Sequence, residues 1–406
     1  MKKIIYILFV FLSVALVYSC SEEQVGQPAT SGVVPGQVRN PVAESIPGGA
    51  KITYDLPGDE DLLYVKAVWT VNGVEKNTSA SLNSKTLVIK GFGSTDPQTV
   101  LLYSVSRSKN VSAPVSVPIT PGTPPVRSIS ETIFMKAAFG GLLITWQNEA
   151  KEEISIVVQE KDDEGEMKEI DVIYSNTSDG NYTVRNRPAE EREFAVFVRD
   201  RWNNISEVKK AVLTPLYEVK LDKTLMARKI LPGDYAGERG SRPWAFMFND
   251  LVTVGSNVWH AQNASLPRLF TIDLSVTAQL SRYTYWHRYG YLYSIDGGNL
   301  KYWKVYGTNT LSSETSDDYW TATEEGTGWK KDWTLLADCE SFKPSGMAIG
   351  SSVTQEDMDY ASNGFPFDLP MEAPPVRYIR FHISETWGGI IDWQVEELSF
   401  WGQEIK

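Results

Sequence analysis

Residues 64–71 read YVKAVWTV, a run in which the side chain at every second position is apolar. A second run of strand-forming residues, FAVFV, lies at 194–198. Alternation with a period of two is typical of β-strands that bury one face. Turn signals such as Asn72-Gly73 and Asp179-Gly180 separate these runs, and no helical pattern of ten residues interrupts them. The pattern predicts an all-β chain.

These runs lie within an internal repeat. A set of glycine, β-branched and aromatic residues recurs 92 positions later, and a polar turn element recurs 94 positions later. The first set is Gly48-Gly49, Ile52-Thr53 and Tyr54, matched by Gly140-Gly141, Ile144-Thr145 and Trp146; the second is Arg107, Asn110 and Ser112, matched by Arg201, Asn204 and Ser206. A period of this size indicates duplicated domains. About seven short strands in roughly 95 residues favour an immunoglobulin-like or fibronectin-like β-sandwich for each copy, acting as a spacer.

The first twenty residues have the pattern of an export signal. Met1-Lys2-Lys3 is basic, and residues 4–17 form a mostly apolar run of signal-peptide length. The run ends in Val17-Tyr18-Ser19-Cys20, which resembles the bacterial lipobox, and the acidic triplet 21–23 resembles an export tag of Bacteroidetes lipoproteins. The resemblance implies an outer-membrane lipoprotein that faces the cell exterior and is anchored through lipidated Cys20. An ordinary signal peptide with an incidental cysteine is the alternative.

Composition excludes several classes of function. The net charge of −12 argues against a nucleic-acid partner, because phosphate backbones require a basic surface. Three histidines and two cysteines are too few for a His-rich metal cluster, a Cys-based zinc site or a disulfide framework. Ten of the 13 tryptophans and all three histidines follow residue 216, so the functional site is expected in that part of the chain.

The chain is expected to divide into five parts. These are a signal peptide at 1–19, a tether at 20–36, two sandwiches at 37–122 and 123–216, and a third domain at 217–406. Alternating runs such as 269–274 and 377–383 predict a jelly-roll β-sandwich for the third domain. Trp259, Trp286, Trp303 and Trp401 occupy strand positions and are expected in its core.

Five segments of the third domain resemble the discoidin, or coagulation-factor C-type, domain, a galactose-binding-like fold shared with family 32 carbohydrate-binding modules. They are Trp259-His260, 270–274, 304–307, 377–380 and 397–402. The mature chain is similar to Bacteroidetes surface lipoproteins encoded in polysaccharide-utilisation loci, in which two fibronectin-like domains precede a discoidin-like domain.

The resemblance implies a carbohydrate site. Sugar-binding members use a histidine, a residue three positions later and an arginine, which correspond here to His260, Asn263 and Arg288. Sugars also require an aromatic platform beside hydrogen-bonding groups. Trp387 is the first candidate for that platform, with Trp320 and Trp329 behind it. The structural alternatives are that His260 and Arg288 pair at a loop edge and that Trp387 only holds its own loop.

Many discoidin-like modules bind a structural calcium ion, and the resemblance implies Asp250 and Glu397 as its carboxylate ligands here. The Asp-Gly pair of the family is absent, and calcium prefers several oxygen ligands.

No motif of a nucleophilic hydrolase, a phosphate-binding loop or a zinc protease occurs in the chain. Together with this absence, the resemblance implies a non-enzymatic lipoprotein that binds oligosaccharide or polysaccharide for a neighbouring glycan transporter complex. A protein-interaction or complex-stabilising lipoprotein without a sugar site is the alternative, and an auxiliary glycoside hydrolase is the third possibility.

Overall fold

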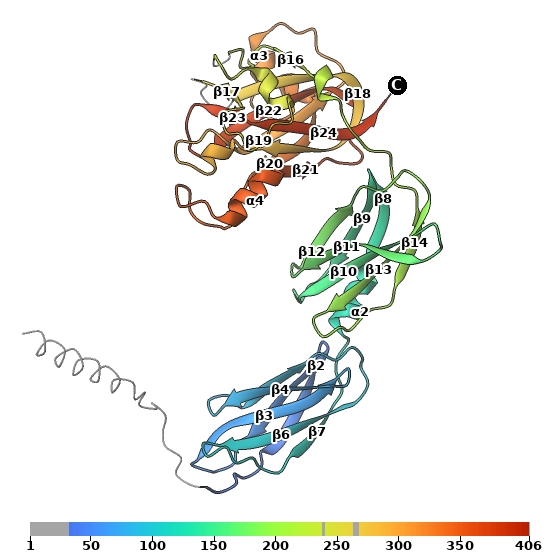
Figure 1. Cartoon of the computed structure of the whole chain (residues 1–406), viewed down its shortest axis with the longest axis vertical. Coiled ribbons are helices and arrows are strands. Elements are labelled where there is room, and N and C mark those ends of the chain that lie inside the picture. Colours follow the sequence, from blue (N-terminus) through green and yellow to red (C-terminus); the bar gives the residue numbers. More distant parts are fainter. Residues whose placement is uncertain (1–31, 238–239, 263–267, 406) are drawn as a thin grey trace, which may run out of the picture.

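The computed structural model describes residues 32–237, 240–262 and 268–405. The described chain is nearly all β, as the sequence predicts, and three sandwiches follow one another along its long axis (Figure 1). Cys20 and Asn263 lie outside the described residues. Among the described residues, no helix combines the length and the apolar character needed to cross a membrane.

The first sandwich packs two antiparallel sheets face to face. One sheet has the strand order β1-β2-β5 and the other β4-β3-β6-β7. The alternation seen at 64–71 places Val65, Ala67, Trp69 and Val71 in the core between the sheets. The strands are β1 (Arg39–Ile46), β2 (Gly49–Asp55), β3 (Leu62–Val71), β4 (Val74–Ser81), β5 (Thr86–Lys90), β6 (Gln98–Ser106) and β7 (Val115–Ile119).

The second sandwich repeats this plan, with a short helix added before its first strand. Its sheets have the orders β12-β9-β8 and β11-β10-β13-β14. The elements are α2 (Pro125–Thr132), β8 (Phe134–Ala138), β9 (Gly141–Gln147), β10 (Ile154–Lys161), β11 (Met167–Ser175), β12 (Asp179–Val184), β13 (Arg192–Asp200) and β14 (Lys209–Leu213). Helix α2 buries Val126 and Ile129 against this core.

The repeated glycine pair has the same steric cause in both sandwiches. Gly48 and Gly140 take positive φ angles of 60° and 65°, which side chains with a Cβ rarely adopt. A Cβ on Gly49 would lie 1.9 Å from the carbonyl oxygen of Ile89, and one on Gly141 would lie equally within the neighbouring strand. The pair therefore allows a tight turn followed by close approach of two strands.

The third sandwich is organised around one long strand, β18 (Arg268–Trp286). Its first part pairs with β16 and β22, and its last part pairs with β21 and β24. The main sheet has the order β15-β24-β18-β22-β19-β20, and β17 pairs with β23. The other strands are β15 (Val219–Lys220), β16 (Ala227–Lys229), β17 (Trp259–Ala261), β19 (Leu300–Thr308), β20 (Thr334–Glu340), β21 (Phe365–Asp368), β22 (Val376–Thr386), β23 (Trp393–Val395) and β24 (Glu397–Glu404).

Short helices lie in the loops of this sandwich. The α-helices are α3 (Asp317–Trp320) and α4 (Gln355–Asn363), and the 3₁₀ helices are η1 (Lys223–Leu225), η2 (Trp244–Phe248), η3 (Tyr289–Tyr291) and η4 (Gly328–Lys331). Helix α4 begins with a capping box between Thr354 and Asp357.

Aromatic side chains fill the core of the third sandwich. Trp259 and Trp303 are buried there, as the sequence predicts. Trp286 and Trp401 differ from that expectation, because both are only half-buried and lie on the outer side of β18 and β24.

Hydrogen bonds and ion pairs between adjacent sandwiches stabilise each junction. At the first junction, the Asn204 amide donates to the Gly91 carbonyl oxygen at 2.9 Å, and Lys90 pairs with Glu152. At the second, Glu218 accepts from Arg185 at 3.0 Å and from Arg282 at 3.1 Å. The Glu218 side chain is only 7% exposed. This buried carboxylate therefore links the second sandwich to the third through its bonds to Arg185 and Arg282.

Candidate functional site

His260, Arg288, Tyr291, Asp392 and Gln394 gather at one end of the third sandwich, and we call this group the loop-end cluster. The His260 Nε2 lies 3.1 Å from the Asp392 carboxylate. The Arg288 Nη1 donates to the Gln394 side-chain oxygen at 3.0 Å, and its guanidinium stacks 4.0 Å over the Tyr291 ring. Tyr291 is 41% exposed. The structure thus brings two of the sequence-predicted site residues into one group.

Local backbone pairing explains why these residues meet. Strand β17 carries His260 and pairs with β23, where His260 stands opposite Gln394. Arg288 comes directly after β18, and its Nε donates to the Gly255 carbonyl oxygen at 2.6 Å. The imidazole of His260 is only 3% exposed, whereas the guanidinium of Arg288 is half-buried. Arg288, Tyr291 and Asp392 are therefore the members of the cluster that offer more surface, whereas His260 and Gln394 are buried.

Glu396 holds the loops of the cluster together. Its carboxylate accepts the backbone N–H groups of Val254, Gly255 and Tyr289 at distances of 2.6–3.1 Å. Burial raises the pKa of Glu396, and these three N–H groups oppose that rise. Three charge-assisted hydrogen bonds from two loops to one carboxylate hold both loops in a fixed geometry.

Trp387 lies on a neighbouring loop. Its backbone N–H donates to the Asn299 carbonyl oxygen, and the Asn299 side chain accepts from the Arg288 N–H. The indole N–H of Trp387 donates to the Ser341 hydroxyl at 2.8 Å, and the ring packs edge-on against Tyr293. These contacts hold Trp387 in its own loop. The two other platform candidates, Trp320 and Trp329, are 2% and 0% exposed and belong to a separate core cluster.

The proposed calcium ligands Asp250 and Glu397 do come together, but a lysine lies between them. The Lys223 Nζ donates to the Asp250 carboxylate at 2.6 Å and to the Glu397 carboxylate at 2.7 Å. The Lys223 and Glu397 side chains are 4% and 1% exposed. Burial raises the pKa of Glu397, and the ammonium group opposes that rise.

The donor set does not fit calcium, because a fixed positive charge already occupies the position between the two carboxylates. Within the described part of the chain, no group of three or more His, Cys, Asp or Glu side chains could hold a metal ion.

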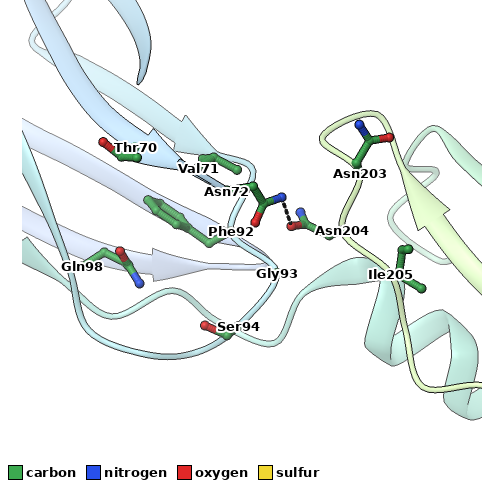
Figure 2. Close-up of a pocket in the computed structure, with 10 residues that line it drawn as sticks. All are labelled: Thr70, Val71, Asn72, Phe92, Gly93, Ser94, Gln98, Asn203, Asn204 and Ile205. Carbon is green, nitrogen blue, oxygen red and sulfur yellow. Dashed lines mark hydrogen bonds between the residues drawn. The ribbon is translucent and has the colours of Figure 1, made fainter. Parts of the chain in front are cut away.

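Figure 2 shows a hollow of about 360 Å³ at the first junction. Asn72 points toward Asn204 across it, and the two amides are 3.1 Å apart. Asn72 also donates to the Trp202 carbonyl oxygen, and Asn204 to Asp200. These amides hold the junction together and are not free to recognise a ligand.

Sequence reasoning missed Tyr291, Asp392, Gln394 and Glu396. The signal for two of them was present, because Gln394 and Glu396 alternate along the chain with the buried apolar residues Trp393 and Val395. No comparable pattern marks Tyr291 or Asp392, which lie in loops.

Comparisons with known proteins found family models that match three successive stretches of the chain. Three family models match it, each described as a domain of unknown function: DUF4959 at residues 35–121, DUF5126 at 122–224 and DUF5000 at 248–402. No curated protein matches the chain. Among solved structures, a two-domain fibronectin type III segment of chicken tenascin is 12% identical and covers 44% of this chain and 99% of its own, with a TM-score of 0.23.

A family 32 carbohydrate-binding module from a family 31 glycoside hydrolase of Clostridium perfringens is also similar. It is 12% identical and covers 44% of this chain and 96% of its own, with a TM-score of 0.26. The strand topology of this chain defines an all-β protein made of three consecutive β-sandwiches.

A SusE-like protein is 35% identical to this chain, and the match covers 70% of this chain and 100% of that protein, with a TM-score of 0.43. On this identity, the chain belongs to the family of SusE-like proteins.

Proposed function

We propose that this chain is a cell-surface carbohydrate-binding protein that captures glycan for a polysaccharide-uptake system. The loop-end cluster carries the proposal, because it joins a partly exposed guanidinium to an exposed tyrosine ring in the third sandwich. Membership of the SusE-like family and the resemblance to surface lipoproteins of polysaccharide-utilisation loci support the uptake setting. Lipidated Cys20 is the proposed anchor, and the domains at 37–122 and 123–216 are the proposed spacers.

The chemistry of the loop-end cluster is that of binding. Arg288, which Gln394 holds in place, supplies a donor for sugar hydroxyls, and Tyr291 supplies an aromatic face for the C–H side of a ring. Asn263, three positions after His260, is the proposed further hydrogen-bonding group. We assign the platform to Tyr291 rather than Trp387, because Tyr291 is exposed whereas Trp387 is half-buried against Tyr293.

A glycan array probed with the mature chain, followed by calorimetry on the glycan that binds, tests the proposal. Arg288→Ala is expected to weaken binding about tenfold, since hydrogen bonds to charged groups contribute roughly 1.5–3 kcal/mol. Tyr291→Ala is expected to weaken it comparably. Arg377→Ala is the matched control, because Arg377 pairs with Asp273 on β18, outside the cluster.

Two results would contradict the proposal. The first is that the mature chain binds no glycan on the array. The second is that Arg288→Ala and Tyr291→Ala both bind as tightly as the natural chain, which would leave these residues a structural role. Tyr291→Ala keeps the test decisive if Arg288→Ala lowers the melting temperature, because Tyr291 is the more exposed of the two.

A further inference from the structure

A hollow of about 420 Å³ lies on the outer face of the sheet formed by β15, β24 and β18, and we call it the sheet-face groove. Strand pairing sets its residues in rows: Trp401 stands between Lys220 and Arg282, and Ser399 stands opposite Thr284. In the next row, Trp286 stands opposite Glu397. None of these residues belongs to the loop-end cluster, so the groove is a separate feature.

Two half-buried indoles flank the sheet-face groove, and each is held in place. The Trp286 indole N–H donates to the Ser362 carbonyl oxygen at 3.1 Å. The Arg282 guanidinium stacks 3.9 Å from the Trp401 ring, and Glu218 holds that guanidinium from its other side. The rows of Trp401 and Trp286 are four positions apart on β18, a span of about 13 Å along the strand. Rings fixed in advance lose little conformational entropy when a ligand binds.

The floor between the indoles carries polar groups with unused hydrogen-bonding capacity. Thr284, Ser399 and Asn363 line the groove; Asn363 is exposed, whereas Thr284 and Ser399 are only 6% and 1% exposed. Among the described residues, no protein group hydrogen-bonds the side chains of these three. Polar groups that lack protein partners are available to a polar ligand, and a hydroxyl or an amide can both donate and accept.

The charges around the sheet-face groove are already neutralised. Lys220 pairs with Asp250 at 2.7 Å, and Arg282 pairs with Glu218 at 3.1 Å. Glu397, at the inner end, pairs with Lys223. A charged ligand would therefore have to compete with ion pairs that exist in the free protein. An uncharged, hydroxyl-rich ligand would not.

We propose that the sheet-face groove is a second carbohydrate-binding site, specific for neutral oligosaccharides. Apolar C–H faces of the sugar rings would pack against Trp286 and Trp401, and ring hydroxyls would bond Thr284, Ser399 and Asn363. This inference rests on the proposed function, since it adds a site to a glycan-binding protein. It differs in place and in residues from the loop-end cluster.

Calorimetry on the full mature chain tests the groove, with neutral α-glucan, β-glucan, β-mannan and xylan oligosaccharides as probes. Trp401→Ala is expected to weaken binding of the recognised probe about tenfold, and Ser399→Ala about fivefold. Tyr174→Ala is the matched control, because Tyr174 is 77% exposed in the second sandwich and is expected to leave affinity unchanged. If the two sites act separately, Arg288→Ala and Trp401→Ala are each expected to weaken one of two binding events per chain and to leave the other unchanged.

The outcomes separate this inference from the proposed function. If Arg288→Ala weakens binding while Trp401→Ala and Ser399→Ala do not, the groove is no site and the proposed function stands. If no probe binds and the array is also blank, both fail. A groove variant that loses a protein partner but keeps its sugar affinity would make the groove a protein-docking surface instead. Should Trp401→Ala fail to fold, Ser399→Ala and Asn363→Ala decide the question.

Discussion

Each of the three histidines has a different environment, and burial decides what each can do. His260 pairs with Asp392 at the loop-end cluster. His287 is surrounded by the rings of Tyr285, Tyr293 and Phe365, and burial lowers its pKa to about 3. Burial likewise lowers the pKa of His382, in strand β22, to about 4. Both favour the neutral form, His287 as a buried histidine and His382 as a half-buried one.

Acid is therefore expected to destabilise the third sandwich through His287. Its folded pKa lies below the unfolded value of 6.5, so its contribution is fully present above pH 6.5 and is lost as pH falls toward 3. At pH 5 the loss from this group is about 2 kcal/mol. Urea unfolding of the natural chain and of His287→Phe at pH 8 and pH 5 measures it. Equal losses in both proteins would contradict the assignment.

At the scale of elements, strand pattern predicted the fold well because alternation reports burial directly. The glycine pairs and the alternating strands identified two sandwiches before any contact was known. The prediction of core burial was wrong for Trp286 and Trp401. For Trp286, the phase of alternation along β18 indicated the outer face of the sheet. Trp286 is in phase with Arg282 and Thr284, whereas the core residues Tyr283 and Tyr285 occupy the other phase. Tryptophan identity alone suggested burial, and strand phase overrides it.

The candidate site was less predictable, because loops bring its members together. His260 and Arg288 were predicted as a pair, but Asp392 comes from a loop 132 positions away from His260, and local pattern cannot show such a contact. Lys223 was missed for the same reason, since its partner Glu397 lies 174 positions further along the chain.

The buried ion pair between Lys223, in helix η1, and Glu397 is expected to stabilise the third sandwich. Lys223→Met is expected to lower the free energy of unfolding by about 3 kcal/mol, because it leaves Glu397 charged, buried and without its ammonium partner. Lys220→Met is the matched control: it also removes a lysine bonded to Asp250, but Lys220 is 42% exposed, so the expected loss is below about 1 kcal/mol. Denaturant unfolding measures both.

The same arrangement predicts that calcium does not stabilise the natural protein. Its melting temperature is expected to be equal in excess calcium chloride and in EDTA, since stabilisation by a ligand requires a site that binds it. A clear rise in calcium would restore Asp250 and Glu397 as metal ligands and overturn the assignment of Lys223.

At the scale of the whole molecule, the domains are expected to be separable although their junctions are fastened. A fragment beginning at Tyr217 retains β15 and keeps Glu218 beside Arg282 and Ser281, losing only the bonds to Arg185 and its sandwich. We expect residues 217–406 to fold alone and to bind glycan as tightly as the full chain. Circular dichroism melts and calorimetry check this, and a fragment that cannot fold would indicate a core shared between domains.

Anchoring is tested on the intact cell. Cys20→Ala is expected to release the protein from the outer-membrane fraction, because a protein without its lipid lacks the proposed hold on the bilayer. Cys339→Ala is the matched control, since Cys339 is buried in the third sandwich. Equal membrane fractionation of Cys20→Ala and the natural chain would contradict the lipoprotein assignment.

The bonds of Glu218 to Arg185 and Arg282 across the second junction affect how far the chain can extend. A string of domains on loose links folds back on itself, so its mean extension grows only with the square root of its length. Links fastened from both sides make extension grow in proportion to the number of domains. The distance from the start of the first sandwich to the third one is then set by the number of sandwiches between them. Deleting one sandwich is expected to shorten that distance by the full length of a sandwich.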